Sequence, residues 1–375
     1  MTFLIFIAIL SILVLIHEFG HFIVAKKNGI KIEEFGVGIP PRIFGKKIGG
    51  TIYSLNWLPF GGFVRMLGED SEDEKALKNH HSFMAKKPNQ RALVLLAGVS
   101  MNLLLAVLLY YIFFTFNKFQ TFYIPLIFQH KFPFGKVETI GTTVSGFLEG
   151  SSAKKSGVEL GDAILKIDDT PVYSVLDVRS AVKGKVNTEV TLLLSDLKTP
   201  DNKTTHIVKT VPIVDESGNT IIGVYLTDSV RIKYDKLAEK IFVGPVHAYN
   251  MLGYSTSSLY KLFKMSIESK DISPVSQTVS GPVGIYNVVG GILEYGGSKV
   301  VLNLLDFMAL VSLSLAFLNI LPFPALDGGR LVFVIIEMIR GGKKLRPSLE
   351  SKIHGFGMAV LLGILLIVTV KDIVM

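Results

Sequence analysis

The sequence predicts a polytopic α-helical membrane protein with four transmembrane helices, a membrane-associated β-hairpin and one inserted α+β domain. Of its 375 residues, 49% are hydrophobic, and the mean hydropathy of +0.46 is high for a soluble chain. The apolar residues gather in four runs that are long enough, or nearly so, to span a hydrocarbon layer of about 30 Å. These runs cover residues 2–25, 92–116, 305–326 and 355–370. The polar stretch 117–304 between the second and third runs predicts the inserted domain.

The first apolar run is expected to stay in the protein as a membrane span. No basic residue precedes it and no A-x-A site follows it, so it does not have the pattern of a cleaved signal peptide. The chain contains no cysteine, which excludes disulfides, zinc–thiolate sites and cysteine catalysis.

The distribution of basic residues predicts the orientation of the spans. Lysines and arginines are concentrated after span 1, before span 2 and between spans 3 and 4, whereas the other flanks carry few. The positive-inside rule then places both termini outside the membrane. The net charge of +8 therefore reflects topology, and we exclude nucleic-acid binding. The concentrated residues are Lys26, Lys27, Lys31, Lys86, Lys87, Arg91, Arg340, Lys343, Lys344, Arg346 and Lys352.

The first span contains a motif with the spacing of a metal site. His17, Glu18 and His21 spell H-E-x-x-H, which puts two imidazoles one helical turn apart with a carboxylate beside them. Zinc is bound by such a histidine pair, and the glutamate can act as a base. Because charged groups are costly inside a membrane, they usually serve a function there. The plainer alternative is that they line a helix contact or a pore.

An aspartate in the third span is the best-placed third ligand. Spans 1 and 3 are predicted to run in the same direction, with His17 about 21 Å below the outer end of span 1. Asp327 lies about 20 residues below Asp306, next to the polar Asn319 and two prolines that interrupt the helix. Catalytic zinc usually takes three protein ligands and a water. Alternatively, Asp327 is an interfacial residue that caps the helix beginning at Gly328-Gly329.

The cytoplasmic loop between spans 1 and 2 is expected to have two parts. Residues 51–66 alternate apolar and polar side chains and predict a β-hairpin, or a bent strand, that turns at residues 59–62 and dips into the membrane. Residues 69–91 form a charged connector, in which His80 and His81 are expected to be solvated.

The outer segment predicts a small β-barrel with two helices at about 134–228, in which a DLKTPDNK turn joins two strands. Such a domain typically offers a strand edge to an extended peptide, although a plug over the membrane part is an equal alternative. Residues 235–300 predict amphipathic helices on the outer membrane surface, with a Gly/Pro turn at 280–289. His130, His206 and His247 have no partners at ligand spacing and are expected on the surface.

Six motifs in this order resemble the site-2 protease family of intramembrane zinc metalloproteases, of the bacterial regulator-of-sigma-E protease type. The motifs are HEFGH (17–21), LPFGGFVRM (58–66), AGVSMN (97–102), GSSAKKSGVELGDAILKIDDTPV (150–172), SGPVGI (280–285) and NILPFPALDGG (319–329). Together they cover nearly the whole chain. The combination of HExxH in span 1 with N-x-x-P-x-P-x-L-D-G in span 3 is specific, whereas HExxH alone is common among peptidases.

The resemblance implies a role for each matching residue. One Zn²⁺ per chain would be bound by His17, His21 and Asp327, with Glu18 as the catalytic acid/base. Asn319, Pro322 and Pro324 would help to hold the substrate, and the segment around Gly61 and Gly62 would be the family's membrane-embedded β-element. Residues 134–228 would be a PDZ-like domain that filters substrates outside the membrane.

The resemblance also implies an activity and a location. The chain would cleave single-pass membrane proteins, such as anti-sigma factors or signal-peptide remnants, in a bacterial inner membrane. Its domains would be a first membrane half at 1–116, the PDZ-like domain, the amphipathic region 235–300 and a second membrane half at 301–375. A peptide or protein could bind the PDZ-like domain.

One departure and three alternatives accompany this interpretation. The enterobacterial member carries two PDZ domains in tandem, and this chain has room for one, so a two-domain filter is not assumed. The alternatives are a membrane-anchored PDZ scaffold with an inert HExxH motif, a transporter, and an anchored peptidase for soluble substrates. Intact ligation disfavours the first, four spans without an inverted repeat disfavour the second, and the depth of HExxH disfavours the third.

Overall fold

The computed structural model describes residues 1–69, 79–196, 205–215, 218–271, 275, 279–343 and 347–374. It contains two compact units. The first comprises Met1–Tyr110, Met265–Gly291 and Leu304–Met375, and the second comprises Tyr111–Lys264 and Ile292–Asn303. Residues 70–78 of the charged connector and residues 197–203 of the DLKTPDNK turn lie outside the described residues.

Four long apolar helices match the four predicted runs. They are α1 (Thr2–Lys27), α3 (Pro88–Phe116), α10 (Val300–Ile320, preceded by the short 3₁₀ turn Gly297–Lys299) and α12 (Pro347–Val374). Each is long and apolar enough to cross a membrane within the described part of the chain. Apolar side chains surround each helix on all sides, which is typical of a span rather than of a surface helix.

The third span ends earlier than predicted. We expected it to reach residue 326, but α10 ends at Ile320. Pro322 and Pro324 follow within four residues, and proline offers no N–H for a helical hydrogen bond. The chain crosses six residues outside helical structure and then enters α11 (Asp327–Ile339). Asp327 therefore stands at the first position of a new helix.

Several contacts fix α11 and the loop before it. Arg330 forms an ion pair with Glu69, and the buried Glu337 forms one with the buried Arg91 at the start of α3. The Ala325 N–H donates a hydrogen bond of 3.0 Å to Nδ1 of His354 in α12. These contacts connect the segment that carries Asp327 to Glu69, to α3 and to α12.

The loop after α1 forms a sheet from two long strands, of which sequence analysis found one. β1 (Ile32–Ile48) and β2 (Thr51–Met66) are joined at Gly49-Gly50, where both glycines have positive φ values of 57° and 89°. A two-residue turn with this geometry matches the twist of an antiparallel pair. The prediction for residues 51–66 is confirmed in its bent-strand form: residues 52–55 and 62–65 flank residues 34–37 and run in opposite directions, so β2 reverses direction between residues 55 and 62.

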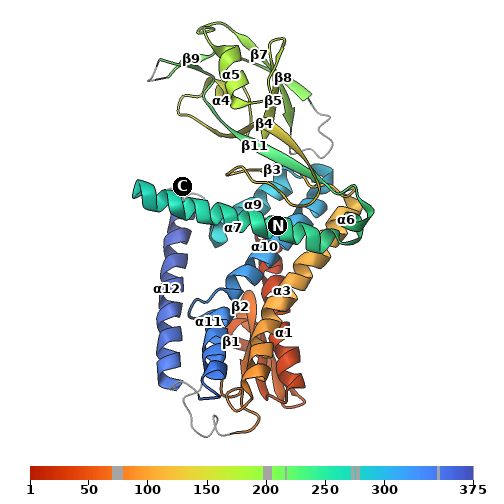
Figure 1. The fold of residues 1–375 in the computed structure, drawn as a ribbon, viewed down its shortest axis with the longest axis vertical. Coiled ribbons are helices and arrows are strands. Elements are labelled where there is room, and N and C mark those ends of the chain that lie inside the picture. The colour runs from red at the N-terminus through yellow and green to blue at the C-terminus, as the bar shows by residue number, and fades with distance from the viewer. Residues whose placement is uncertain are drawn as a thin grey trace. The chain divides into compact units, whose positions relative to one another are not determined.

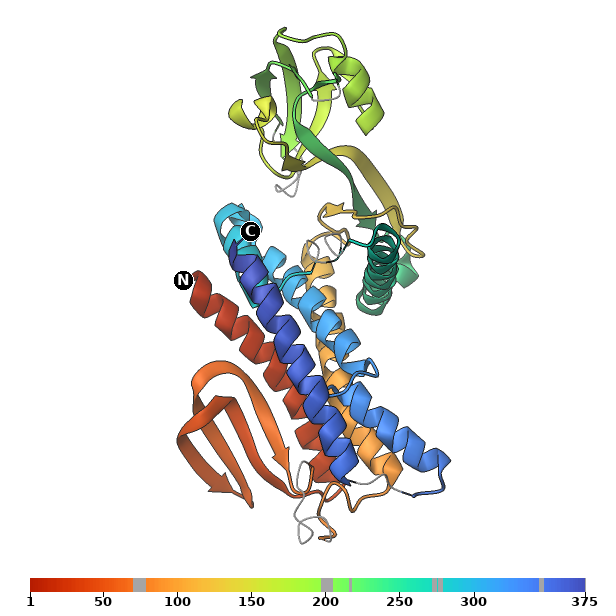
Figure 2. The same cartoon turned by 90° about the vertical axis from the view of Figure 1, so that its left-hand side faces the viewer.

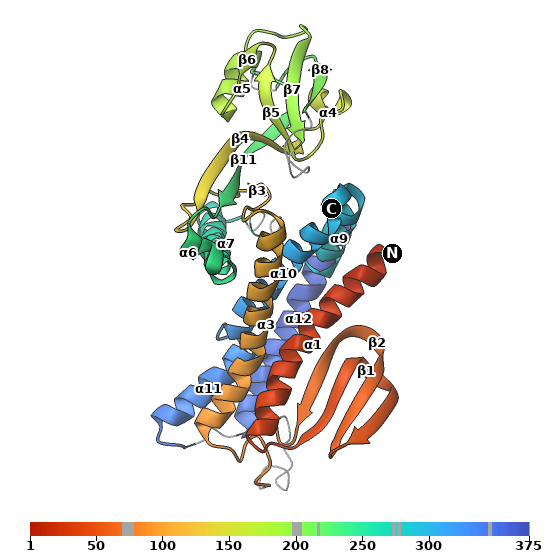
Figure 3. The ribbon, with the colours of Figure 1, turned by 90° about the vertical axis from the view of Figure 1, so that its right-hand side faces the viewer.

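The bends let the two strands pair more than once. Residues 34–37 of β1 pair with 62–65 of β2 on one side and with 52–55 on the other, and residues 44–48 pair with 51–55. Residues 62–65 are therefore at an edge of the sheet. This edge packs on α1, where a side chain on Gly62 would meet Leu15 at 2.6 Å and one on Gly61 would meet Val14 at 3.2 Å. Figures 2 and 3 show the sheet beside α1.

Residues 282–289 are helical, which corrects the Gly/Pro turn predicted for 280–289. Helix α9 (Pro282–Tyr295) begins at a proline, which is well tolerated in a first helical turn. Its free N–H groups are bound by a carboxylate from another helix, since Gly281 N and Gly284 N donate to Oδ2 of Asp372 in α12 at 2.7 and 3.0 Å.

The second unit contains a seven-stranded sheet among its described residues, with the order β3-β11-β4-β5-β7-β8 and β6 paired to β5 (Figure 1). Two short helices, α4 (Ser152–Lys155) and α5 (Val175–Val182), accompany it, as predicted. The predicted β-barrel is not closed among the described residues, because no pairing joins the end strands β3 and β8. The core includes Ile164, Ile167, Leu192 and Leu194, which are fully buried. The strand bounds are β3 (Ile124–Pro125), β4 (Lys136–Phe147), β5 (Asp162–Ile167), β6 (Thr170–Pro171), β7 (Val190–Asp196), β8 (Thr205–Thr210), β9 (Ile213–Val214), β10 (Thr220–Ile221) and β11 (Val224–Lys233).

Two helices follow the sheet, and a histidine in the second of them corrects one further expectation. They are α6 (Leu237–Ile241) and α7 (Val243–Ser269). His247 of α7 was expected on the surface but is 1% exposed, and its Nδ1 lies 2.8 Å from the Tyr234 hydroxyl. Burial lowers the pKa of His247 to about 3, so this side chain is neutral. It is a core residue that anchors α7 to the end of β11.

Candidate metal centre

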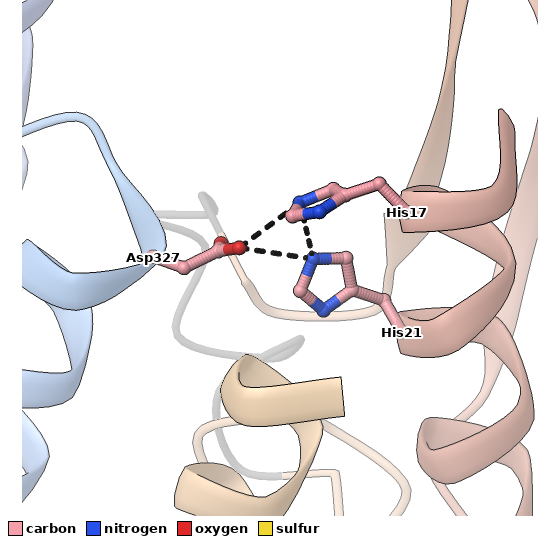
Figure 4. A group of neighbouring side chains, drawn as sticks. All are labelled: His17, His21 and Asp327. Carbon is pink, nitrogen blue, oxygen red and sulfur yellow. Dashed lines mark hydrogen bonds and ion pairs between the residues drawn. The ribbon is translucent and has the colours of Figure 1, made fainter. Parts of the chain in front are cut away.

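The two histidines of H-E-x-x-H turn the same ring nitrogen toward each other. His17 and His21 are one turn apart on α1 and are 7% and 5% exposed. Their Nε2 atoms are 3.1 Å apart (Figure 4). Two buried nitrogens at this distance need either a proton or a cation between them, because two lone pairs repel each other.

Asp327 completes the group from a segment about 300 residues away. Its Oδ2 lies 3.0 Å from His17 Nε2 and 3.2 Å from His21 Nε2. Within the described residues, this is the one group of three or more His, Cys, Asp or Glu side chains whose ligand atoms all lie within 4.8 Å of one another. The first residue of α11 thus meets the C-terminal half of α1, and Figure 4 shows Asp327 pointing at both histidine rings.

The hydrogen bond of His21 identifies the state of its ring. His21 Nδ1 lies 2.8 Å from the carbonyl oxygen of Val94 in α3. A carbonyl only accepts hydrogen bonds, so this nitrogen carries the proton. In the neutral ring, Nε2 then has a free lone pair that points at His17 and Asp327. This is the tautomer in which a histidine binds a metal through Nε2.

The spacing of the three ligand atoms suits a tetrahedral zinc ion. Ligands at about 2.0–2.1 Å from zinc in tetrahedral geometry are roughly 3.3–3.4 Å from one another. The three separations here are 3.0, 3.1 and 3.2 Å. Two imidazoles and a carboxylate also match the ligand types of catalytic zinc sites, which leave a fourth position open. The residues therefore fit a zinc ion with small adjustments.

Glu18 lies between the two histidines in sequence and is fixed by the edge of the sheet. Its Oε2 accepts a hydrogen bond of 3.0 Å from the backbone N–H of Val64 in β2. This bond connects the candidate base to the strand that packs on α1. The edge of the sheet at residues 62–65 is therefore hydrogen-bonded to the helix that carries His17 and His21.

Helix α3 approaches α1 closely at the site. A methyl group on Gly20 would strike the carbonyl of Ala97, and one on Gly98 would strike the rings of both His17 and His21. Small residues at such points let two helices pack backbone to backbone. Sequence analysis quoted AGVSMN (97–102) as a motif without assigning it a role. In the structure this segment is the wall behind the two histidines.

The predicted substrate-binding residues lie on two segments. Gly61 and Gly62 are on the edge strand against α1, one turn before His17. Asn319 is in the last turn of α10, and Pro322 and Pro324 are in the break before Asp327. Their role in binding a substrate stays a prediction. His80 and His81 are exposed, as expected for residues outside the site.

Comparisons with known proteins match the whole chain. The model of Peptidase family M50 matches residues 5–364. A Clostridium perfringens chain described as a zinc metalloprotease is 34% identical over 366 residues, which cover 97% of this chain and 96% of that one. The regulator of sigma-W protease RasP of Bacillus subtilis is 26% identical and covers 99% of this chain and 98% of its own.

A comparison of folds matches one part of the chain. The PDZ domain of an SdrC-like protein from Listeria monocytogenes aligns with 24% of this chain and 92% of that domain. The sequence identity is 20% and the TM-score is 0.21.

Proposed function

This chain belongs to Peptidase family M50, the site-2 protease family, and from that premise we propose that His17, His21 and Asp327 bind its zinc and that Glu18 is its catalytic acid/base. The protein is an intramembrane zinc metalloprotease. The observation that carries the residue assignment is the meeting of three ligand atoms from α1 and α11 within 3.0–3.2 Å.

The chemistry divides between the ion and Glu18. When bound, zinc polarises the scissile carbonyl and makes water at the site more acidic. Glu18 takes a proton from the attacking water as the C–O bond forms. It then returns that proton to the amide nitrogen as the C–N bond breaks, so that a carboxylic acid and an amine leave. The Val64 N–H keeps one oxygen of Glu18 in place, which leaves the other oxygen for the proton.

The edge of β2 provides a way to hold an unwound substrate. Peptide bonds of a transmembrane helix are hidden in i→i−4 hydrogen bonds, so cleavage needs local unwinding. In hydrocarbon each unpaired backbone group costs several kcal/mol. An extended substrate segment that pairs with the edge at residues 62–65 regains these bonds beside Glu18. Asn319 at the end of α10, with Pro322 and Pro324 in the following break, is assigned to hold the other side of the segment, because this stretch leads directly into Asp327.

The second unit and the membrane placement complete the proposal. Residues 134–228 are assigned as a PDZ-like domain on the outer side of a bacterial inner membrane, with both termini outside and the metal group toward the cytoplasm. A cavity of about 280 Å³ beside α5, lined by Val178, Arg179 and residues 220–226, suits an extended peptide. The substrates are single-pass membrane proteins, and anti-sigma factors or signal-peptide remnants are the proposed examples.

A Glu18→Gln variant tests the assignment of the acid/base. The assay uses the full chain in detergent and a single-pass membrane protein whose span contains glycine and proline. We expect cleavage to fall by about 10²–10⁴-fold, the usual contribution of general acid–base catalysis, while zinc stays bound. The control is Glu294→Gln at an exposed carboxylate of α9, which should keep both zinc and cleavage. Wild-type cleavage by the Glu18 variant would contradict the proposed role.

A further inference from the structure

The ring nitrogen of His17 that faces away from the metal group has a polar neighbour on α3. Asn102 is 1% exposed, and its Nδ2 lies 3.4 Å from His17 Nδ1. That distance is long for a hydrogen bond, which is normally 2.7–3.2 Å for an N–H donor. The amide oxygen, Oδ1, is buried and has no hydrogen-bond partner among the residues that the structure describes. Leaving a buried oxygen without a hydrogen bond is energetically unfavourable.

The orientation of the amide conflicts with metal binding by His17. If His17 binds zinc through Nε2, its Nδ1 carries the proton and must donate. An amide NH₂ also donates, so two donors would then face each other. The NH₂ group and the oxygen of an asparagine amide have nearly the same size, so either end fits opposite His17. Turning the amide by 180° puts the unpaired oxygen opposite the Nδ1 proton and removes the conflict.

The contact of His21 with Val94 shows the hydrogen bond that His17 would need from Asn102. The Val94 carbonyl accepts from His21 Nδ1 at 2.8 Å, so the second histidine has the acceptor that metal binding requires. Val94, Gly98 and Asn102 follow one another at four-residue spacing on α3, which places them on one helical face. This face presents the Val94 carbonyl to His21 and the Asn102 amide to His17. Gly98 lies between them and has no side chain, which leaves room for both rings.

We propose that Asn102 is the positioning residue for His17: its amide oxygen accepts the Nδ1 proton and thereby directs Nε2 to the zinc. This inference rests on the zinc site proposed above. Outer partners of metal-bound histidines fix the ring and its tautomer, and their loss typically lowers metal affinity by about 10–100-fold. Asn102 also joins α3 to α10, because its backbone oxygen accepts from Ser312 Oγ at 2.8 Å. That contact uses the main chain, so it survives substitution of the side chain.

The test measures zinc affinity by chelator competition in the detergent-purified full chain. Asn102→Leu should bind zinc about 10–100-fold more weakly than the wild type. Asn102→Asp keeps an acceptor and should bind at least as tightly as the wild type. The matched control is Ser312→Ala, which breaks the α3–α10 contact without touching His17 and should leave the affinity unchanged.

The outcomes separate this inference from its premise. Wild-type affinity in Asn102→Leu overturns the positioning role, and so does weakened binding in Asn102→Asp, since that result means the site needs a donor. If Asn102→Leu does not fold, the Asn102→Asp result alone decides. Cobalt(II) absorption then shows whether the ligand geometry matches that of the wild type. A wild-type chain that takes up no zinc or cobalt would refute the metal site itself.

Discussion

The histidine pair depends on a residue that has no side chain. Gly98 faces both rings, and any Cβ at this position would overlap the Nε2 end of His21 and the Cε1 atom of His17. Neither ring can move away freely, because His21 is bonded to Val94 and both rings contact Asp327. The absence of one methyl group on α3 is therefore a condition for the metal geometry on α1.

Gly98→Ala should strongly weaken zinc binding and abolish cleavage, although alanine favours a helix over glycine by about 0.5–1 kcal/mol. The measurement is zinc content after dialysis, together with the thermal midpoint of the metal-free protein. Gly363→Ala in α12 is the matched control, since nothing lies within 4 Å of its added methyl group. Equal zinc content in the two variants would show that α3 does not shape the site.

At the scale of elements, the sheet of β1 and β2 supplies what the helices cannot. The helices satisfy their own backbone groups and offer no N–H or C=O to an unwound substrate. The edge at residues 62–65 has backbone groups of this kind, and it lies against α1 next to Glu18. The position of this edge predicts that cleavage is limited by how easily the substrate leaves its helical form.

Substrate variants test this role of the edge. Replacing one glycine near the cleaved bond with alanine should slow cleavage by about fivefold, because glycine weakens a helix by about 1 kcal/mol. The same replacement at the opposite end of the span is the control and should have little effect. The readout is the cleavage rate with zinc-loaded protein. A rate that does not respond to either change would contradict strand pairing after unwinding.

Particular residues show why some of this structure could be predicted and some could not. The four apolar helices and the pairing of His17 with His21 follow from hydropathy and from the H-E-x-x-H spacing, which are local signals. Asp327 was selected from the predicted direction and depth of spans 1 and 3, and it does lie beside the two histidines. β1 was missed because its partners are set by the Gly49-Gly50 turn and by bends, not by an alternating pattern. His247 was misplaced because its burial depends on Tyr234 and the packing of α7. The role of α3 at the site was missed because glycine and asparagine show their function only next to a partner.

At the scale of the molecule, the first unit brings together segments from both ends of the sequence. α1 contributes the two proposed histidine ligands and Glu18, α11 contributes Asp327, and α3 packs against the two histidine rings. His354 of α12 and the ion pairs of Arg330 and Glu337 hold α11 in place. The central claim is therefore that one zinc ion joins the two halves of the chain.

Zinc stoichiometry of the detergent-purified protein tests this claim most directly, with the wild type compared with Asp327→Ala. The control is Asp235→Ala, which alters an exposed aspartate outside the site. We predict about one zinc per chain in the wild type and the control. In Asp327→Ala the affinity for zinc should fall by more than the factor of about 10–100 that is typical when a hydrogen-bond partner of a zinc-bound histidine is lost. A folded wild type without zinc, or an Asp327 variant that binds zinc as tightly as the wild type, would contradict the account.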